Sequence, residues 1–176
     1  MPLSQTIQFN GASAEVLYRA YLSSAQHAAM TLDGTYAATY RRRGDDIDTG
    51  TVGDELWAIG PTADNGNVQY SVSARVLELV PDRLIVLSWK NKAWDLAVEP
   101  SEVTDLPSTL VLTFTGNFMS AEIRLSQTNI PSYQVRIPET GEIGPLSEIV
   151  DRHWNILYWD PMRQYFANLV TTGDRR

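Results

Sequence analysis

The chain has 176 residues, of which 43% are hydrophobic and 20% are charged, and this composition is typical of one globular domain and excludes a largely disordered chain. It contains no cysteine, which excludes disulfides, thiol nucleophiles and thiolate metal sites. With 14 Lys and Arg against 21 Asp and Glu, the net charge of −7 disfavours nucleic acid and anionic membranes as partners.

The N-terminal residues 1–13 lack the basic start and the apolar run of a secretion signal. No later stretch approaches the ~20 apolar residues that are needed to span a bilayer. We therefore expect a cytoplasmic protein without a membrane partner. The sequence is compatible with either a monomer or a homodimer.

One strand and two short helices are predicted near the N-terminus. Polar and apolar residues alternate over Thr6–Phe9, which indicates a strand. Ser13 stands where an N-cap would, and apolar residues then recur at helical spacing over Ala14–Leu22. A second short helix is predicted at Ala25–Met30.

Residues 31–50 show no sustained period and are predicted to form a loop, with an irregular strand at Tyr36–Tyr40. The only basic run of the sequence, Arg41-Arg42-Arg43, falls in this loop. Three aspartates follow within a few residues and largely cancel its field. We interpret the run as a solvated loop, and the alternative is an anion site.

Several antiparallel strands are predicted in the middle of the chain. Apolar and β-branched residues separated by turn residues indicate strands at 53–59, 68–80 and 84–90. A proline-containing connection at 92–107 leads to two more strands, at 109–114 and 122–126, in which apolar and polar residues alternate.

The last predicted element is a long helix from Leu146 to Val170, preceded by a segment rich in proline and glycine. Its apolar stripe is broad, and Pro161 is expected to bend it because proline lacks the amide donor of a regular helix. Consecutive strands with helices outside them indicate an α+β fold with the helices on one face of the sheet.

Four motifs resemble the activator of heat-shock-protein-90 ATPase homologue family, within the helix-grip superfamily that includes START-like and birch-pollen-allergen-like (SRPBCC) proteins. They lie at 9–21, 78–89, 125–131 and 153–162, in the family's order. The resemblance implies a single domain spanning 1–176, with a curved antiparallel sheet, two short N-terminal helices and a long C-terminal helix over a cavity. Segments 31–69 and 132–147 depart from the family pattern.

The sequence offers few groups for catalysis or metal binding. His27 and His153 are each isolated from any ligand-spaced partner, and no zinc-protease, phosphate-loop or esterase motif occurs. We expect no metal and no cofactor.

Aromatic residues give the clearest indication of a binding site. Large rings line apolar cavities well and provide a few directed hydrogen bonds. Core packing is the simpler interpretation of any single tryptophan, whereas the set as a whole favours a cavity. Five tryptophans fall on predicted strands, on an adjoining loop and on the last helix, which meet in a helix-grip fold, and one of them, Trp94, lies in the connection at 92–107. The predicted ligand-binding residues are Trp57, Tyr70, Arg75, Trp89, Phe114, His153, Trp154, Tyr158 and Met162.

Arg75 has two possible orientations. It shares a predicted face with Leu77 and Leu79, so it would point inward to bind a carboxylate or phenolate, whereas a β-bulge would turn it to solvent.

Three functions are consistent with the sequence. The leading hypothesis is non-enzymatic binding of a small apolar or aromatic molecule between the sheet and the C-terminal helix. The resemblance implies an alternative, a stress-related module that docks on a chaperone. A third hypothesis is an enzyme resembling polyketide cyclases or hydrolases, with His153, Arg75 and Tyr158 as catalytic candidates.

Overall fold

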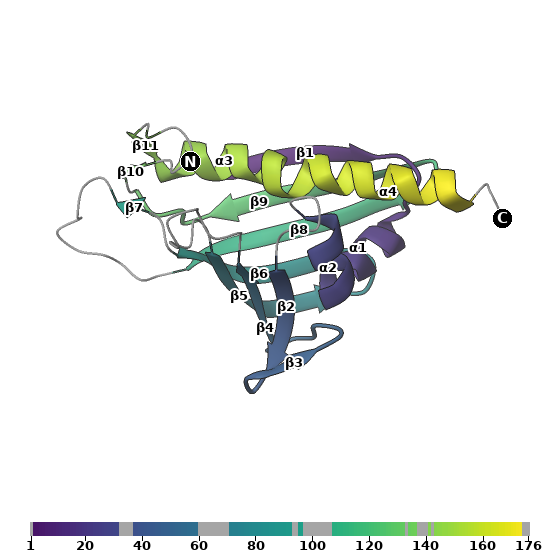
Figure 1. Cartoon of the computed structure of the whole chain (residues 1–176), viewed down its shortest axis with the longest axis horizontal. Coiled ribbons are helices and arrows are strands. Elements are labelled where there is room, and N and C mark those ends of the chain that lie inside the picture. Colours follow the sequence, from purple (N-terminus) through teal and green to yellow (C-terminus); the bar gives the residue numbers. More distant parts are fainter. Residues whose placement is uncertain are drawn as a thin grey trace.

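In the computed structural model of the protein, the described residues are 2–31, 37–59, 71–92, 95–96, 107–132, 134–136, 141 and 143–173. They form an α+β fold in which an antiparallel sheet lies beside a long C-terminal helix and two short N-terminal helices (Figure 1). The predicted arrangement of sheet and helices is therefore confirmed.

The main sheet has eight strands in the order β1-β9-β8-β6-β5-β4-β2-β3. Their bounds are β1 Leu3–Phe9, β2 Ala37–Arg42, β3 Asp45–Ile47, β4 Glu55–Ile59, β5 Ser71–Val80, β6 Leu84–Lys92, β8 Ser108–Asn117 and β9 Ser120–Thr128. A smaller sheet contains β7 Asp95–Leu96, β10 Gln134–Arg136 and β11 Ile143–Pro145. The strands predicted from alternation are all present, although residues 68–70 of one of them lie outside the described residues.

The helices are α1 Ala14–Leu22, α2 Ser24–Met30, and a C-terminal helix made of α3 Leu146–His153, the π-helical turn η2 Trp154–Trp159 and α4 Asp160–Gly173. Ser13 caps α1 as predicted, because its hydroxyl accepts a hydrogen bond from the Val16 amide. Within the described ranges, no helix is long and apolar enough to cross a membrane.

The segment predicted as a loop at 31–50 contains a β-hairpin. β2 and β3 pair in antiparallel register, and the two residues between them, Arg43 and Gly44, have φ values of +54° and +91°. Positive φ at both positions is typical of a type I′ hairpin turn. The sequence pattern missed this turn because Arg-Gly is not one of the usual pairs, such as Asn-Gly or Asp-Gly, that identify it.

The C-terminal helix packs along β1, and both elements run in the same direction. Near the start of β1, the side-chain amide of Gln5 donates to the carboxylate of Asp151 at 2.8 Å and its oxygen accepts from the Trp159 indole at 2.5 Å. At its end, Phe9 contacts Phe166 edge to face, with ring centroids 6.4 Å apart. Both halves of this short strand therefore contact the helix, the first half through Asp151 and Trp159 and its last residue through Phe166.

Gly11, just after β1, allows the last part of α4 to approach. Its φ is +82°, and a Cβ atom placed there would lie 2.5 Å from Cγ2 of Val170. We expect Gly11→Ala to lower the free energy of unfolding by about 2 kcal/mol, because it adds left-handed strain to an overlap with Val170. Urea denaturation measures this change, with Gly44→Ala, which has positive φ but open space around it, as the control for strain alone. Equal effects of the two substitutions would contradict the close approach.

The C-terminal helix changes its hydrogen bonding directly before Pro161. The Asp160 amide donates to the Asn155 carbonyl, five residues back, so η2 is one wider π turn. Proline has no amide hydrogen, so Pro161 cannot donate a hydrogen bond to a carbonyl of the preceding turn. The extra residue in that turn fits the helix to this missing hydrogen bond. The sequence predicts a bend at Pro161, and the structure has this π turn there.

Candidate functional site

An aromatic cluster lies between the main sheet and the C-terminal helix. Trp154 and Tyr158 both lie in η2, with ring centroids 4.6 Å apart, and Trp89 of β6 lies 5.0 Å from Trp154. The structure thus brings together three of the predicted lining residues. Two others, Phe114 and Met162, are also buried in the core.

His27 of α2, which has no visible partner in the sequence, joins this cluster through Tyr158. Its Nδ1 lies 2.8 Å from the Tyr21 carbonyl, and its Nε2 lies 3.2 Å from the Tyr158 hydroxyl. A carbonyl oxygen only accepts, so Nδ1 carries the proton and Nε2 accepts from the tyrosine. The Tyr40 hydroxyl donates to the same Tyr21 carbonyl at 2.9 Å, and the end of α1 is thereby capped by two side chains.

Burial determines the charge of this histidine. Loss of solvent lowers the pKa of His27 from 6.5 to about 4, while its hydrogen bond to the Tyr21 carbonyl opposes the change. His27 is therefore neutral at pH 7. Burial also raises the pKa of the neighbouring Tyr40 hydroxyl well above its ordinary value. The cluster is an uncharged network at neutral pH.

A second buried network ties the C-terminal helix to the sheet. The Trp154 indole donates to Oε1 of Gln127 at 2.9 Å, and the Gln127 amide donates to the Ser108 hydroxyl at 2.8 Å. The hydroxyl in turn donates to the Trp89 carbonyl at 2.9 Å. Buried polar groups paired in this way fix the position of Trp154 relative to β6, β8 and β9.

The interior rings are closely packed. Trp89, Trp154 and Tyr158 have exposed fractions of only 1–3%, and Tyr21 and His27 have 0%. A water-sized space beside these rings would expose their atoms, so no such space adjoins these five side chains. Two hollows lined by described residues lie on the other face of the sheet.

Two predicted lining residues, Trp57 and Arg75, lie on that other face. Leu56 and Ala58 point into the core from β4, which turns Trp57 outward, and Ala74 does the same for Arg75 on β5. The inward orientation considered for Arg75 is therefore wrong. Its apolar neighbours suggested the wrong face because Leu77 is itself exposed, next to a shift in the β5–β6 register.

The remaining predicted site residues are not brought together. His153 is half-buried at the end of α3, and Arg75 lies across the sheet from Tyr158. The three catalytic candidates therefore do not converge on one point. Tyr70 and Trp94 lie outside the described residues.

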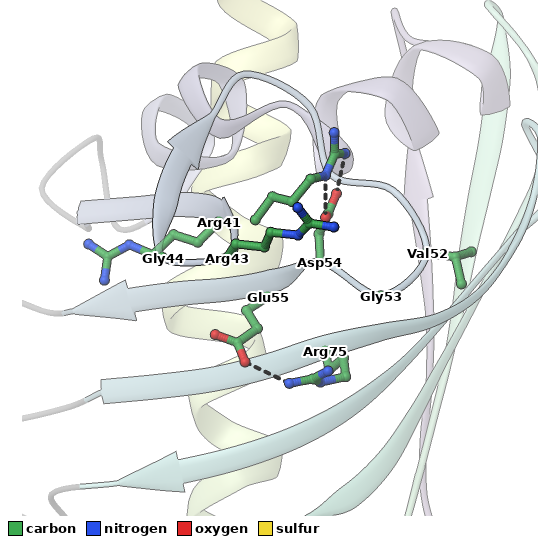
Figure 2. Close-up of a pocket in the computed structure, with 9 residues that line it drawn as sticks. Arg41, Arg43, Gly44, Val52, Gly53, Asp54, Glu55 and Arg75 are labelled. Carbon is green, nitrogen blue, oxygen red and sulfur yellow. Dashed lines mark hydrogen bonds and ion pairs between the residues drawn. The ribbon is translucent and has the colours of Figure 1, made fainter.

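The outer face of the sheet contains two adjoining hollows of about 490 Å3 and 330 Å3, which share Glu55 and Arg75. Figure 2 shows the first, with Arg75 pointing toward Glu55. We name the two hollows together the outer groove. The charged and aromatic side chains that characterise it are Arg41, Arg43, Glu55, Trp57, Arg75 and Lys90.

One wall of the outer groove is held by Asp54, which is 4% exposed. Both carboxylate oxygens accept from the Arg42 guanidinium at 2.8 Å, and the Thr51 amide donates to one of them at 2.7 Å. The Arg42 hydrogen bonds keep the pKa of Asp54 well below its ordinary value. This bidentate pair fixes the start of β4 beside the β2–β3 hairpin.

No group of three or more His, Asp or Glu side chains in the described ranges is arranged to hold a metal ion. Among the described residues, Nε2 of His27 accepts from the Tyr158 hydroxyl, and the rings of Tyr21 and Tyr40 lie beside the imidazole.

Comparisons with solved structures find the same fold in several organisms. An HSP90 activator from Plasmodium falciparum is 18% identical, with a TM-score of 0.62 over 95% of this chain and 96% of that one. Protein Ms6760 from Mycobacterium smegmatis is 15% identical, with a TM-score of 0.60 over 93% and 89%. The Aha1 dimer from Colwellia psychrerythraea is 13% identical, with a TM-score of 0.52 over 89% of each chain. At these identities the likeness concerns the fold.

A comparison with curated proteins finds no match. The family model described as "Activator of Hsp90 ATPase homolog 1-like protein" matches residues 11–166, which is most of the sequence and covers both the aromatic cluster and the outer groove. The chain therefore belongs to the activator of Hsp90 ATPase homolog 1-like family.

Proposed function

We propose that this protein is a non-enzymatic docking module that binds an HSP90-type chaperone and stimulates its ATPase. One observation carries the proposal: the described interior around Tyr158 is filled, whereas the opposite face of the sheet is open and charged. A filled core with an open exterior surface suits the binding of a macromolecule better than the enclosure of a small ligand.

The similar fold of the Plasmodium falciparum HSP90 activator supports the proposal. That protein is matched over 96% of its chain, so the shared fold accounts for nearly all of it. By analogy with that protein, this chain could dock on a chaperone through the fold itself, without an additional docking segment. In this role the protein would act in the cytoplasm, together with the chaperone, during the response to stress.

The test is the ATPase rate of a purified HSP90-type chaperone, measured while this protein is added. We expect the rate to rise and to saturate as the complex forms, because a partner that favours the active conformation shifts the chaperone's population. The hydrolysis that remains when a chaperone inhibitor is present does not come from the chaperone, and it is subtracted from the measured rate. A rate that stays constant up to concentrations far above those of the chaperone would contradict the proposal.

A second candidate function is the binding of a small apolar or aromatic molecule beside Trp89, Trp154 and Tyr158. The π turn η2 favours it, because π turns recur at functional sites and this one carries two of the three rings. Native mass spectrometry of the purified protein, followed by thermal-shift screening with aromatic acids and fatty acids, tests it. A co-purified molecule or a raised melting temperature would support this candidate function. If no molecule co-purifies and no compound raises the melting temperature, this candidate function is excluded.

A further inference from the structure

We propose that the outer groove binds a short acidic segment of a partner protein, extended across β2, β4, β5 and β6, with a flat side chain of that segment resting on Trp57. This inference rests on the proposed function, because it identifies the chemistry of the segment that a docking surface on this face would hold.

The register of the strands places the side chains of the outer groove in two parallel rows. Arg41, Glu55, Arg75 and Ser88 lie opposite one another on four adjacent strands. Because side chains alternate along a strand, the residues two positions away form the next row on the same face, and that row includes Trp57 and Lys90. Four strands span about 14 Å, which is the length of roughly four residues of an extended peptide.

The charge of the groove is opposite to that of the whole protein. Five cationic side chains line it, Arg41, Arg42, Arg43, Arg75 and Lys90. Arg42 and Arg75 pair with the lining carboxylates of Asp54 and Glu55, and Arg41 pairs with Asp46 beside the groove. The chain as a whole has a net charge of −7, so this concentration of arginines does not follow from composition. A local excess of positive charge attracts a partner's acidic residues and orients their approach.

The carboxylates of the groove are already engaged. Glu55 accepts from Nη2 of Arg75 at 2.7 Å and from the Trp57 indole at 3.2 Å, and Asp54 is held by Arg42. Among the described residues, no carboxylate forms an ion pair with Arg43, although it lines the groove. Arg43 therefore has its charge available for an incoming carboxylate.

The turn position of Arg43 is a second independent observation. Its φ of +54° is a left-handed conformation that favours glycine, asparagine or aspartate over arginine. An arginine at a position that disfavours it suits a role outside the turn itself. The position also provides a sharp test, because asparagine suits this turn better than arginine does.

Trp57 supplies the apolar part of the groove. The Arg41 guanidinium lies 5.8 Å from the centre of its ring, and the ring is only partly buried on the outer face. Tryptophan and arginine are the residues that most often dominate binding energy at protein interfaces. The charged and hydroxyl side chains around the ring suit an acidic peptide better than an apolar small molecule, and the overall charge disfavours nucleic acid.

The test is the fluorescence anisotropy of a labelled decapeptide of alternating Glu and Tyr residues, titrated with the full chain. We expect saturable binding that weakens as salt is added, and no binding of the matching Gln and Tyr peptide. Arg43→Asn should weaken binding about threefold, and combining it with Arg75→Gln about tenfold. Arg19→Gln, an equal change of charge on α1, should leave the affinity unchanged.

Three results would overturn the inference: equal binding of the Gln peptide, wild-type affinity in the Arg43→Asn and Arg75→Gln double variant, or tighter binding of a thymidine decanucleotide. Thermal melting of Arg43→Asn should match or exceed that of the wild type, so lost affinity cannot be attributed to lost folding. The chaperone assay is read separately. Stimulation without peptide binding refutes the acidic segment alone, whereas peptide binding without stimulation refutes the proposed function.

Discussion

Trp154→Ala is expected to lower the free energy of unfolding by about 3–5 kcal/mol. The side chain is 3% exposed and packs against Trp89, Tyr158 and Trp159, so its removal leaves a large cavity. It also takes the indole donor away from Oε1 of Gln127, which is buried. Chemical denaturation monitored by circular dichroism measures the change.

Trp57→Ala is the matched control for that experiment. It deletes the same side chain from the outer face, where the ring is only partly buried, so we expect a loss of about 1 kcal/mol. Trp154→Phe separates the two contributions, because it keeps most of the ring packing and removes the donor. A loss from Trp154→Ala no larger than that from Trp57→Ala would show that the interior is not packed as described.

Stability is expected to fall between pH 6.5 and pH 4 because of His27. Its pKa is about 4 in the folded protein and 6.5 in the unfolded chain, so the unfolded chain binds the proton first as the pH falls. The stabilisation is complete above pH 6.5 and decreases by about 3 kcal/mol as the pH approaches 4. Urea denaturation at pH 7.5 and at pH 4.5 measures the difference.

The two histidines of the chain provide the control for this pH dependence. His27→Gln should flatten the loss of stability over this range, whereas His153→Gln, at a half-buried position on α3, should keep it. Asp54 does not interfere, since the pKa of its carboxyl lies below the ordinary value and its effect begins at lower pH. An unchanged slope in His27→Gln would contradict the buried neutral histidine.

Local patterns predicted the fold well. Alternation located the strands, Ser13 marked the start of α1, and the apolar stripe after Leu146 marked the C-terminal helix, because each signal arises from burial of one face of one element. The hairpin at Arg43 and Gly44 was missed for the opposite reason. Its turn depends on a backbone conformation that arginine rarely adopts, and no local preference reveals it.

The candidate site was predictable only in part. Trp89, Trp154 and Tyr158 could be expected to meet, because strand and helix face each other in this fold. His27 could not, since its partner Tyr158 is 131 residues away and no spacing signals the contact. The outer groove depends on pairings between strands, such as Glu55 opposite Arg75, and a single strand's pattern does not contain that register.

The tryptophan indole signals in a two-dimensional nitrogen–proton spectrum test the central claim, that partners bind the outer face and leave the filled interior unchanged. Trp57 lies in the outer groove, whereas Trp89, Trp154 and Trp159 are buried in the core, and a Trp57→Phe variant assigns the outer signal. When the chaperone is added, we predict that the Trp57 signal shifts or broadens beyond the general broadening of a larger complex. Selective changes at Trp89 and Trp154 with Trp57 unaffected would contradict the account and favour a ligand site inside the fold.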